Sequence, residues 1–322
     1  MEGPPVSVVI PVYNLAAYLE DCVRSVLEQT HRAVEVLIVD NGSTDDSVKI
    51  AERLAAQEPA TIKLLHQPKP GAPAARNLGL GRATGSWIQF LDGDDLLLPE
   101  KIAHQLTFVT DEVAVVAGPV LEREEDGSET VRPLDPTTHE GLFYGGGRLG
   151  FTSSNLWSKR ALEEIGGWNE ALRSSQEYDL MFRLYERGYQ IRRSSEPLTI
   201  RRVHAGQISQ TPYGPRLYNY LKLRHRIFNH LRDQGLIRPE SSHRFVAHYL
   251  SRYAKLRRFS PRLAARFRKV QLKEAMSWPE FANYPDLAKW RWQSDLQVVR
   301  GRIADLLSLR WKRYFGPLDP EV

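Results

Sequence analysis

One stretch, Trp87 to Asp95, constrains this chain more than any other, because it places three carboxylates within four positions after a largely apolar run; it reads W-I-Q-F-L-D-G-D-D. An apolar run of this length predicts a buried strand. Asp92, Asp94 and Asp95 are then expected at the carboxyl end of that strand, where open α/β sheets bind their ligands. Mg²⁺ suits such a place, because it binds one or two carboxylates together with water and phosphate oxygens. The alternative is a polar turn that caps the helix opened by Pro99.

On both sides of this stretch, β-branched runs alternate with apolar residues at helical spacing. Strands are expected at Val6–Val12, Val34–Val39, Thr61–Leu65, Val113–Val120 and Leu198–Val203. Helices are expected at Leu15–Leu27, from a cap at Ser43 or Thr44, and at Gly71–Ala83, Glu100–Val109, Lys159–Ile165 and Gln176–Arg187. Such alternation indicates right-handed βαβ units. The expected class is α/β, with a mostly parallel central sheet and flanking helices.

Composition places the chain among soluble globular proteins, with 42% apolar and 26% charged residues in 322. No run reaches the ~18 apolar residues that span a bilayer. The N-terminal M-E-G-P-P has neither the basic start nor the apolar middle of a signal peptide. A single cysteine, Cys22, rules out an internal disulfide and is expected to pack within a helix. A cytoplasmic location is therefore expected.

The last third of the chain is strongly basic. Residues 215–322 hold 23 Lys and Arg against 9 Asp and Glu, a net charge of +14, whereas residues 1–214 carry −9. Long amphipathic patterns predict an α-helical region over 215–322, including a helix that begins at Pro261 and a last one over Leu296–Leu306. Three interpretations are open: a solvated face, nucleic acid, or the inner face of an anionic membrane. Nucleic acid is not expected, because the aromatics fall at helical core spacing rather than on an exposed platform.

Polar residues follow successive strands of the predicted sheet, at Tyr13 and Asn14, at Asp40, and at Asp92 and Asp94. A nucleoside diphosphate needs such a set: an aromatic to stack on the base, a carboxylate to accept its N–H, and a cation to neutralise the diphosphate. The phosphate loop G-x-x-x-x-G-K-[ST], the dinucleotide fingerprint, the G-x-S-x-G elbow and zinc-ligand spacing are all absent.

Four motifs occur in order: V-S-V-V-I-P-V-Y-N, V-E-V-L-I-V-D-N-G-S-T-D-D-S, A-A-R-N-L-G-L and F-L-D-G-D-D. Together they resemble the nucleotide-binding half of the family 2 glycosyltransferases, which have the Rossmann-like GT-A fold. The resemblance continues through G-G-W-N-E and S-Q-E-Y-D-L to about His204. It implies a domain over 1–214, with a nucleotide-sugar-binding part at 1–120 and an acceptor part at 121–214. The implied activity is metal-dependent inverting transfer of a hexosyl group from a nucleotide sugar, with UDP expected, to a glycan or lipid-linked glycan, as in cell-surface polysaccharide synthesis.

The resemblance also implies residue roles. Donor-binding residues would be Pro11, Val12, Tyr13, Asn14, Asp40, Gly42, Ser43, Arg76, Asp92, Gly93 and Asp94. Asp40 would accept the N3–H of the base, and Arg76 would face the diphosphate rather than form a salt bridge on a helix surface. Asp94 would bind Mn²⁺ or Mg²⁺ directly, and His204 would be a metal or phosphate ligand rather than an ordinary packed histidine. Asp95 is either a partner of that shell or a helix cap, and the cap is preferred.

The catalytic base is expected at the start of the helix over 176–187. The family usually has Glu-Asp there with Asp as the base; this chain has Gln176-Glu177, so the base would be Glu177, one methylene longer. Asp179 is the fallback, although position i+2 faces away from i. Asn155 and an exposed or pocket-lining Trp168 are assigned to the acceptor side. The alternatives are a catalytically silent nucleotide-sugar-binding or scaffold protein, and a GT-A nucleotidyltransferase, whose Gly-rich basic loop after the first strand is missing here.

Overall fold

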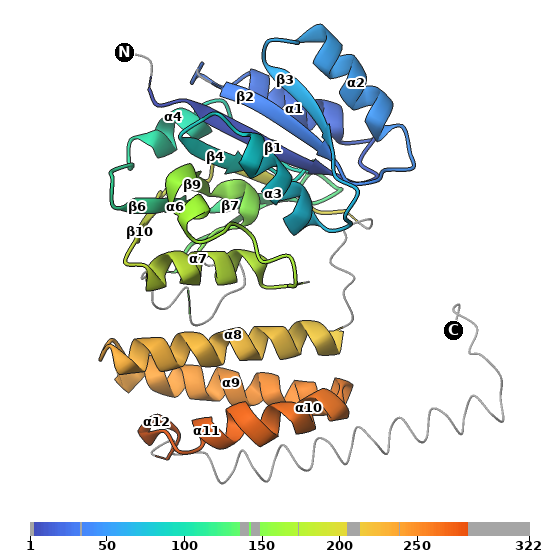
Figure 1. The fold of residues 1–322 in the computed structure, drawn as a ribbon. Helices are drawn as coiled ribbons and strands as arrows, with labels where there is room; N and C mark the ends of the chain where they lie inside the picture. The colour runs from blue at the N-terminus through green and yellow to red at the C-terminus, as the bar shows by residue number, and fades with distance from the viewer. Residues whose placement is uncertain are drawn as a thin grey trace, which may run out of the picture. The chain divides into compact units, whose positions relative to one another are not determined.

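The computed structural model describes residues 3–32, 34–135, 142, 149–172, 174–204, 213–237 and 239–282. Contacts between Cα atoms divide the chain into two compact units, residues 1–209 and residues 210–322 (Figure 1). The helix predicted over Leu296–Leu306 lies outside the described residues.

In the first unit, strands and helices alternate along the chain (Figure 1). The strands are β1 (Val6–Val12), β2 (Val34–Asp40), β3 (Ile62–His66), β4 (Trp87–Phe90), β5 (Leu96–Leu97), β6 (Val113–Ala117), β7 (Val120–Arg123), β8 (Glu129–Arg132), β9 (Leu156–Ser158), β10 (Gln190–Arg193) and β11 (Thr199–Arg202). The helices are α1 (Leu19–Leu27), α2 (Ser47–Gln57), α3 (Ala72–Arg82), α4 (Lys101–Leu106), α6 (Lys159–Glu164) and α7 (Gln176–Glu186), with a 3₁₀ turn η1 (Thr152–Ser154). This order confirms the predicted α/β class.

Seven strands form the central sheet, in the order β10-β6-β9-β4-β1-β2-β3. Most neighbours are parallel, and β9 runs antiparallel between β4 and β6. Val12 pairs with Asp40, and Val9 pairs with Phe90, so β1, β2 and β4 end at one edge of the sheet. The strand order reverses at β1, which is the position where such sheets bind ligands.

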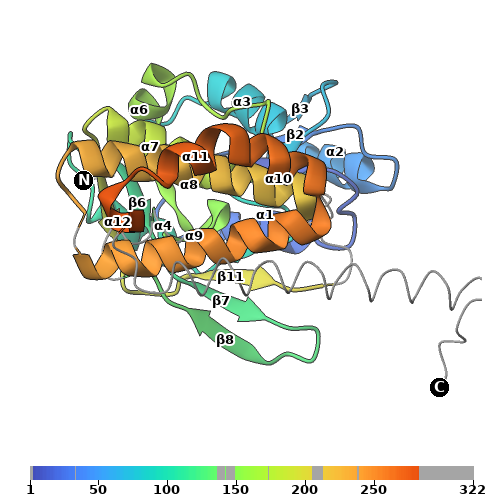
Figure 2. The same ribbon diagram turned by 90° about the horizontal axis from the view of Figure 1, so that it is seen from below.

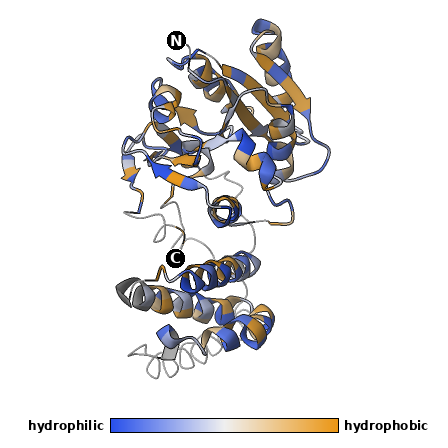
Figure 3. Cartoon of the chain, turned by 60° about the vertical axis from the view of Figure 1, so that its left-hand side comes forward, coloured by the Kyte–Doolittle hydropathy of each residue, from blue (hydrophilic) through white to orange (hydrophobic). Residues whose placement is uncertain are grey.

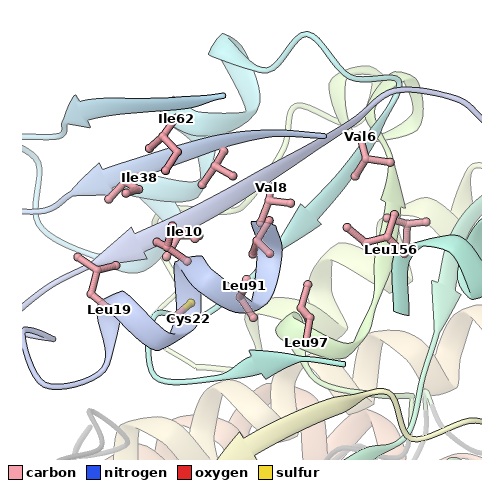
Figure 4. Close-up of a cluster of buried hydrophobic side chains, with 14 of the residues drawn as sticks. Val6, Val8, Ile10, Leu19, Cys22, Ile38, Ile62, Leu91, Leu97 and Leu156 are labelled. Carbon is pink, nitrogen blue, oxygen red and sulfur yellow. The ribbon is translucent and has the colours of Figure 1, made fainter. Parts of the chain in front are cut away.

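Helices cover both faces of β1. On one face, Val8 and Ile10 pack against Cys22 of α1 (Figure 4), which agrees with a packing role for the cysteine. On the other face α3 approaches closely through Gly79, where a Cβ would lie 2.3 Å from Cγ1 of Val9. Because both faces are covered, β1 and β2 are apolar along most of their length, as the hydropathy colouring in Figure 3 shows.

A second sheet, in the order β5-β11-β7-β8, corrects the strand predicted across Val113–Val120. That run divides at Gly118-Pro119, so β6 joins the large sheet and β7 the small one. The break has a physical cause: Pro119 has no N–H for a ladder, and a Cβ on Gly118 would lie 2.9 Å from the carbonyl oxygen of Ser154. β7 and β8 form a hairpin through a turn at Gly127, whose φ is 83° (Figure 2).

The prediction that Ser43 or Thr44 caps the second helix was wrong. Helix α2 begins at Ser47, with Asp46 as its N-cap residue. Ser43 and Thr44 bind Asn14 instead, in the loop after β1. Similarly, the first helix begins at Leu19 rather than at Leu15.

The second unit is helical in its described part. Its elements are α8 (Tyr213–Asp233), α9 (Pro239–Phe259), α10 (Pro261–Phe267), the π-helical turn η2 (Arg268–Leu272), α11 (Lys273–Ala275) and α12 (Pro279–Ala282). Helices α8, α9 and α10 lie side by side (Figures 1 and 2). Aromatic rings fill the space between them: Phe228 stacks on Phe245 at 4.4 Å and on Trp278 at 4.6 Å. No helix in the described residues is both long and apolar enough to cross a membrane.

Candidate active site

Two loops at the carboxyl edge of the sheet are bound to each other. Asn14 follows β1 with φ of 54°, a left-handed conformation that asparagine tolerates. Its side-chain Oδ1 accepts the backbone N–H of Thr44 at 2.7 Å, and its own N–H donates to Oγ of Ser43 at 3.1 Å. Tyr13, beside it, is 47% exposed. The loop after β1 is therefore held by the loop after β2, and it leaves an aromatic ring open to solvent.

Asp40 ends β2 and shapes the loop that follows. Its carboxylate accepts the backbone N–H groups of Gly42 at 3.2 Å and Ser43 at 3.1 Å, and Gly42 has a positive φ of 85°. Burial raises the pKa of Asp40, but the hydrogen bonds from Ser43 and Gly42 outweigh burial and hold that pKa below the ordinary value. Asp40 is therefore a carboxylate, with lone pairs left to accept one further donor.

After β4 the chain makes a tight turn, residues 92–95, here named the acidic turn. The backbone N–H of Asp95 donates to the carbonyl oxygen of Asp92 at 2.9 Å. Asp95 is 4% exposed and accepts a hydrogen bond from Oγ of Ser153 at 2.6 Å. It is not a helix cap, because the next helix, α4, begins six residues later with Glu100 as its N-cap residue. The preferred assignment of Asp95 as a helix cap was therefore wrong, and its role as a partner of the metal shell stays a prediction.

The acidic turn concentrates negative charge. Burial and the charge of Asp92 raise the pKa of Asp94, and burial and both neighbouring charges raise that of Asp95 well above its ordinary value. A divalent cation would relieve this repulsion, so the donor chemistry fits Mg²⁺ or Mn²⁺. Within the described ranges, no three His, Cys, Asp or Glu side chains meet closely enough to hold a metal unaided. Mg²⁺ in proteins commonly takes one or two carboxylates and completes its shell with water and phosphate oxygens.

Gly93 brings the acidic turn against the loop after β1. A Cβ at this position would lie 2.9 Å from Cδ1 of Leu15 and 3.5 Å from the carbonyl oxygen of Pro11. A side chain here would require the end of the Leu15 side chain to shift, while the Pro11 carbonyl lies at ordinary contact distance. Gly93 thus lies where the acidic turn meets the loop after β1, which in turn is bound to the loop after β2.

His204 lies beside the acidic turn although it is 110 residues away in sequence. Its Nε2 lies 3.2 Å from Oδ2 of Asp94, and its ring stacks on Tyr18 at 4.5 Å. Arg202 donates through Nε to the carbonyl oxygen of Asp94 and lies 4.9 Å above the same Tyr18 ring. The fold thus brings His204 to the acidic turn, and its role as a metal or phosphate ligand stays a prediction. Tyr18 and Arg202 could not be predicted as neighbours of this turn, because neither residue belongs to a motif.

Arg76 is buried, with 5% exposure, rather than on a helix surface. Its guanidinium donates to Oδ1 of Asp92 at 2.6 Å and to Oε1 of Gln176 at 3.3 Å. The same group lies 4.7 Å above the ring of Trp168, close enough for a cation–π interaction. Arg76 thus joins the acidic turn to the first residue of α7.

Glu177 lies in the first turn of α7 and is partly exposed. Oγ1 of Thr152 donates to its Oε1 at 2.9 Å. The fallback base, Asp179, is 6% exposed and paired with Nε of Arg183 at 2.8 Å. Arg183 also donates to two backbone carbonyls of the preceding turn, so this pair holds α7 in place. The geometry makes Glu177 the available carboxylate and gives Asp179 a structural role.

Comparison with known proteins decides the family. Residues 7–166 match the sequence profile described as Glycosyl transferase family 2. The chain belongs to this family. An uncharacterized glycosyltransferase of Rickettsia conorii is 38% identical to it over 141 residues, which are 44% of this chain and 22% of that relative. The chain therefore spans only a small part of that relative's length. Glu177 and His204 lie beyond the residues that the family profile matches.

Two solved structures show that this family 2 glycosyltransferase has the GT-A fold. One is S. aureus TarS 1-349 in complex with UDP-GlcNAc, with a TM-score of 0.60 and 18% identity over 87% of this chain and 79% of that chain. The other is the mannosyltransferase PcManGT from Pyrobaculum calidifontis in complex with GDP-Man and Mn²⁺, with a TM-score of 0.56 and 15% identity over 92% and 87% of the two chains.

Two residues assigned to the acceptor side of this family 2 glycosyltransferase lie in its interior instead. Trp168 is 2% exposed and packs edge-on against Phe90 at 5.1 Å, while the side chain of Asn77 binds its backbone N–H and carbonyl. Asn155 is fully buried; its amide accepts from Gly118 and donates to the carbonyl of Leu149. An exposed Trp168 is therefore ruled out, while the assignment of both residues to the acceptor side stays a prediction.

Proposed function

We propose that this protein is a metal-dependent inverting glycosyltransferase that moves a hexosyl group from a nucleotide sugar to a glycan or lipid-linked glycan acceptor. The observation that carries the proposal is the acidic turn, where like charges gather beside His204 and the loops proposed to bind the donor. Arg76 links this turn to helix α7, which carries the partly exposed carboxylate of Glu177.

The donor end favours a uridine diphosphate sugar. Tyr13 offers an exposed ring for stacking on the base, and Asp40 offers an acceptor-only carboxylate for the N3–H of uracil. Gly42 and Ser43 line the same loop. TarS was solved with UDP-GlcNAc and PcManGT with GDP-Man, so both nucleotides belong in the test.

The reaction requires the protein to accept one proton. Glu177 accepts the proton of the acceptor hydroxyl as its oxygen forms a bond to the anomeric carbon. The bond between that carbon and the diphosphate oxygen breaks at the opposite face, and its electron pair leaves with the diphosphate, so the configuration inverts. Asp94 and His204 would hold Mn²⁺ or Mg²⁺, which supplies charge stabilisation to the diphosphate. Arg76 keeps Asp92 in place and adds positive charge behind the turn.

The test is calorimetric titration of UDP-GlcNAc and GDP-mannose with and without Mn²⁺, followed by donor hydrolysis and transfer to a panel of glycan acceptors. We expect binding that strengthens with Mn²⁺ and measurable turnover. Donor binding with neither hydrolysis nor transfer would contradict the proposal and leave a silent nucleotide-sugar-binding protein. Synthesis of a nucleotide sugar from a nucleoside triphosphate would indicate a nucleotidyltransferase instead.

We infer that the basic helical unit brings this cytoplasmic protein to anionic lipid at the inner membrane face. Residues 241–273 contain ten Lys and Arg and no Asp or Glu. On α10 to α11, Arg262, Arg266, Lys269 and Lys273 are exposed, and the nearby Phe259 is 56% exposed. Each basic residue near such a surface contributes about 1 kcal/mol, and an exposed aromatic can enter the headgroup region. Lipid-linked acceptors would be reached there.

Liposome co-sedimentation tests this inference with neutral and with anionic vesicles at low and high salt. We expect binding to anionic vesicles that weakens with salt, because exposed charges are screened beyond about 8 Å at physiological ionic strength. Arg262→Glu with Lys269→Glu should reduce binding by about tenfold or more, whereas Lys49→Glu, an exposed change on α2, should not. Equal, salt-independent recovery in the supernatant with both lipids would leave the basic face as a solvated surface.

A further inference from the structure

We propose that the buried turn η1 positions the two halves of the catalytic site through adjacent hydroxyls, Thr152 on the base Glu177 and Ser153 on the acidic turn. The inference rests on the proposed function and names positioning residues for it. Neither residue belongs to a recognised motif, and both lie in a stretch where the sequence has no periodic pattern.

Thr152 restrains Glu177. The threonine is 1% exposed, and its Oγ1 donates to Oε1 of Glu177 at 2.9 Å. A glutamate has one more rotatable bond than the aspartate that the resemblance leads one to expect at the base position, so its carboxylate sweeps a larger volume. A hydrogen bond from a buried donor selects one orientation of that carboxylate. It occupies Oε1 and leaves Oε2 to accept the proton of the acceptor hydroxyl.

Ser153 holds the acidic turn. Its Oγ donates to Oδ2 of Asp95 at 2.6 Å and accepts the backbone N–H of Asp92 at 3.1 Å. One hydroxyl therefore binds the first residue of the turn and the last. Because Asp94 lies between these two fixed residues, its carboxylate keeps its direction even though like charges oppose it.

The turn itself is anchored on the sheet. Nε2 of Gln89, in β4, donates to the carbonyl oxygen of Ser153 at 2.8 Å, and Nε2 of Gln105, in α4, donates to that of Ser154 at 2.8 Å. All three residues of η1 are 1% exposed. Because η1 is buried and hydrogen-bonded to both β4 and α4, it is held rigidly and can orient the side chains that it binds.

Thr152 and Ser153 are neighbours in the chain, and this limits how far apart the groups that they bind can move. Consecutive Cα atoms lie 3.8 Å apart, so the anchor of the base and the anchor of the acidic turn have a fixed separation. Bond formation and bond cleavage at the anomeric carbon need the base and the departing diphosphate at a defined distance on opposite sides of that carbon. A misplacement of about 1 Å can lower the rate about 100-fold. The turn η1 fixes this distance, because it binds both groups.

The experiment compares Thr152→Val with Thr152→Ser, using donor hydrolysis of UDP-GlcNAc or GDP-mannose, whichever the parent turns over with Mn²⁺. We expect Thr152→Val to lower kcat by about 10- to 100-fold with the donor KM changed by less than about twofold, because the bond acts on the base and not on the donor. Thr152→Ser keeps a hydroxyl and should restore most of the loss. Thr110→Val, which removes an exposed threonine hydroxyl remote from the site, is the matched control.

Ser153→Ala should affect cation-dependent donor binding rather than kcat alone. We expect a rise of about tenfold in the Mn²⁺ concentration that half-saturates UDP binding, measured by calorimetry without turnover. A change in kcat alone would contradict the assignment of Ser153. Thermal unfolding of each variant shows whether it is folded, and Thr152→Ala provides a second deletion if the valine variant does not fold.

The outcomes separate this inference from the proposed function. A parent protein that binds no nucleotide sugar or turns none over removes the proposed function. A parent that turns donor over, together with Thr152→Val or Thr152→Ala of unchanged kcat, removes the positioning role alone. A kcat lost equally in the serine variant would show that the hydroxyl is not the group responsible, and would also overturn the inference.

Discussion

Glu35, at the amino end of the central sheet, and the acidic turn, at its carboxyl end, have carboxyl groups whose pKa values are shifted in opposite directions. At the amino end, Glu35 accepts hydrogen bonds from Oγ of Ser7 at 2.5 Å and from the N–H and hydroxyl of Thr84, with Lys63 nearby. Burial raises the pKa of Glu35, but these hydrogen bonds outweigh it and lower that pKa to about 2. At the carboxyl end, burial and like charges raise the pKa of Asp94 and Asp95. Hydrogen-bond donors outweigh burial at Glu35, as they do at Asp40, whereas at Asp94 and Asp95 burial and like charges prevail.

The largest effect is expected where the carboxyl end does chemistry. Glu177→Gln removes the general base and should lower kcat by about 10²–10⁴-fold while donor binding persists. Steady-state kinetics and donor titration together check this. Asp179→Asn is the matched change two residues away; it should lower the melting temperature by breaking the pair with Arg183 and leave kcat of the folded protein near that of the parent. A dead Asp179→Asn beside an active Glu177→Gln would reverse the two roles.

Next in size is the loss of cation-dependent binding. Asp94→Ala should abolish the strengthening of UDP binding by Mn²⁺, and with it the stabilisation of about 2.7 kcal/mol that a ligand at 100 times its Kd confers. Without ligand, the variant should melt at the same temperature as the parent or higher, because one of three repelling charges is gone. Asp46→Ala, on an exposed residue, is the control. If Mn²⁺ strengthens binding equally in Asp94→Ala, the acidic turn is not the metal site.

The smallest effect belongs to the amino end. Glu35→Gln weakens hydrogen bonds to a charged group and should cost about 1–3 kcal/mol at neutral pH, with no change in Mn²⁺-dependent binding. The folded pKa is depressed, so this stability is present above the ordinary value of 4.5 and is lost as pH falls towards 2. Urea unfolding at pH 6, 4.5 and 3 should therefore show the gap between parent and variant closing. A gap independent of pH would mean that the charge of Glu35 does not matter.

The sequence was sufficient for the fold class and for the acidic turn, because both depend on local patterns. Alternating strand and helix spacing predicts parallel units, and acids after an apolar run predict a polar strand end. It was insufficient where a residue's environment depends on distant segments. Trp168 follows two glycines in a polar turn, which suggests exposure, yet it is buried against Phe90 from a strand almost 80 residues earlier. Thr152 and Ser153 have no periodic pattern at all, and only the fold reveals their partners.

Strand β9 also governs the order in which this unit is completed. It pairs with both β4 and β6, so until Leu156–Ser158 leave the ribosome each of those strands has an edge with unpaired backbone groups. Chains that stop short of this point would expose two adhesive edges, a common origin of aggregation during synthesis. Because Thr152 and Ser153 immediately precede β9, the pairing of β9 also places the turn to which Glu177, later in the chain, is bound.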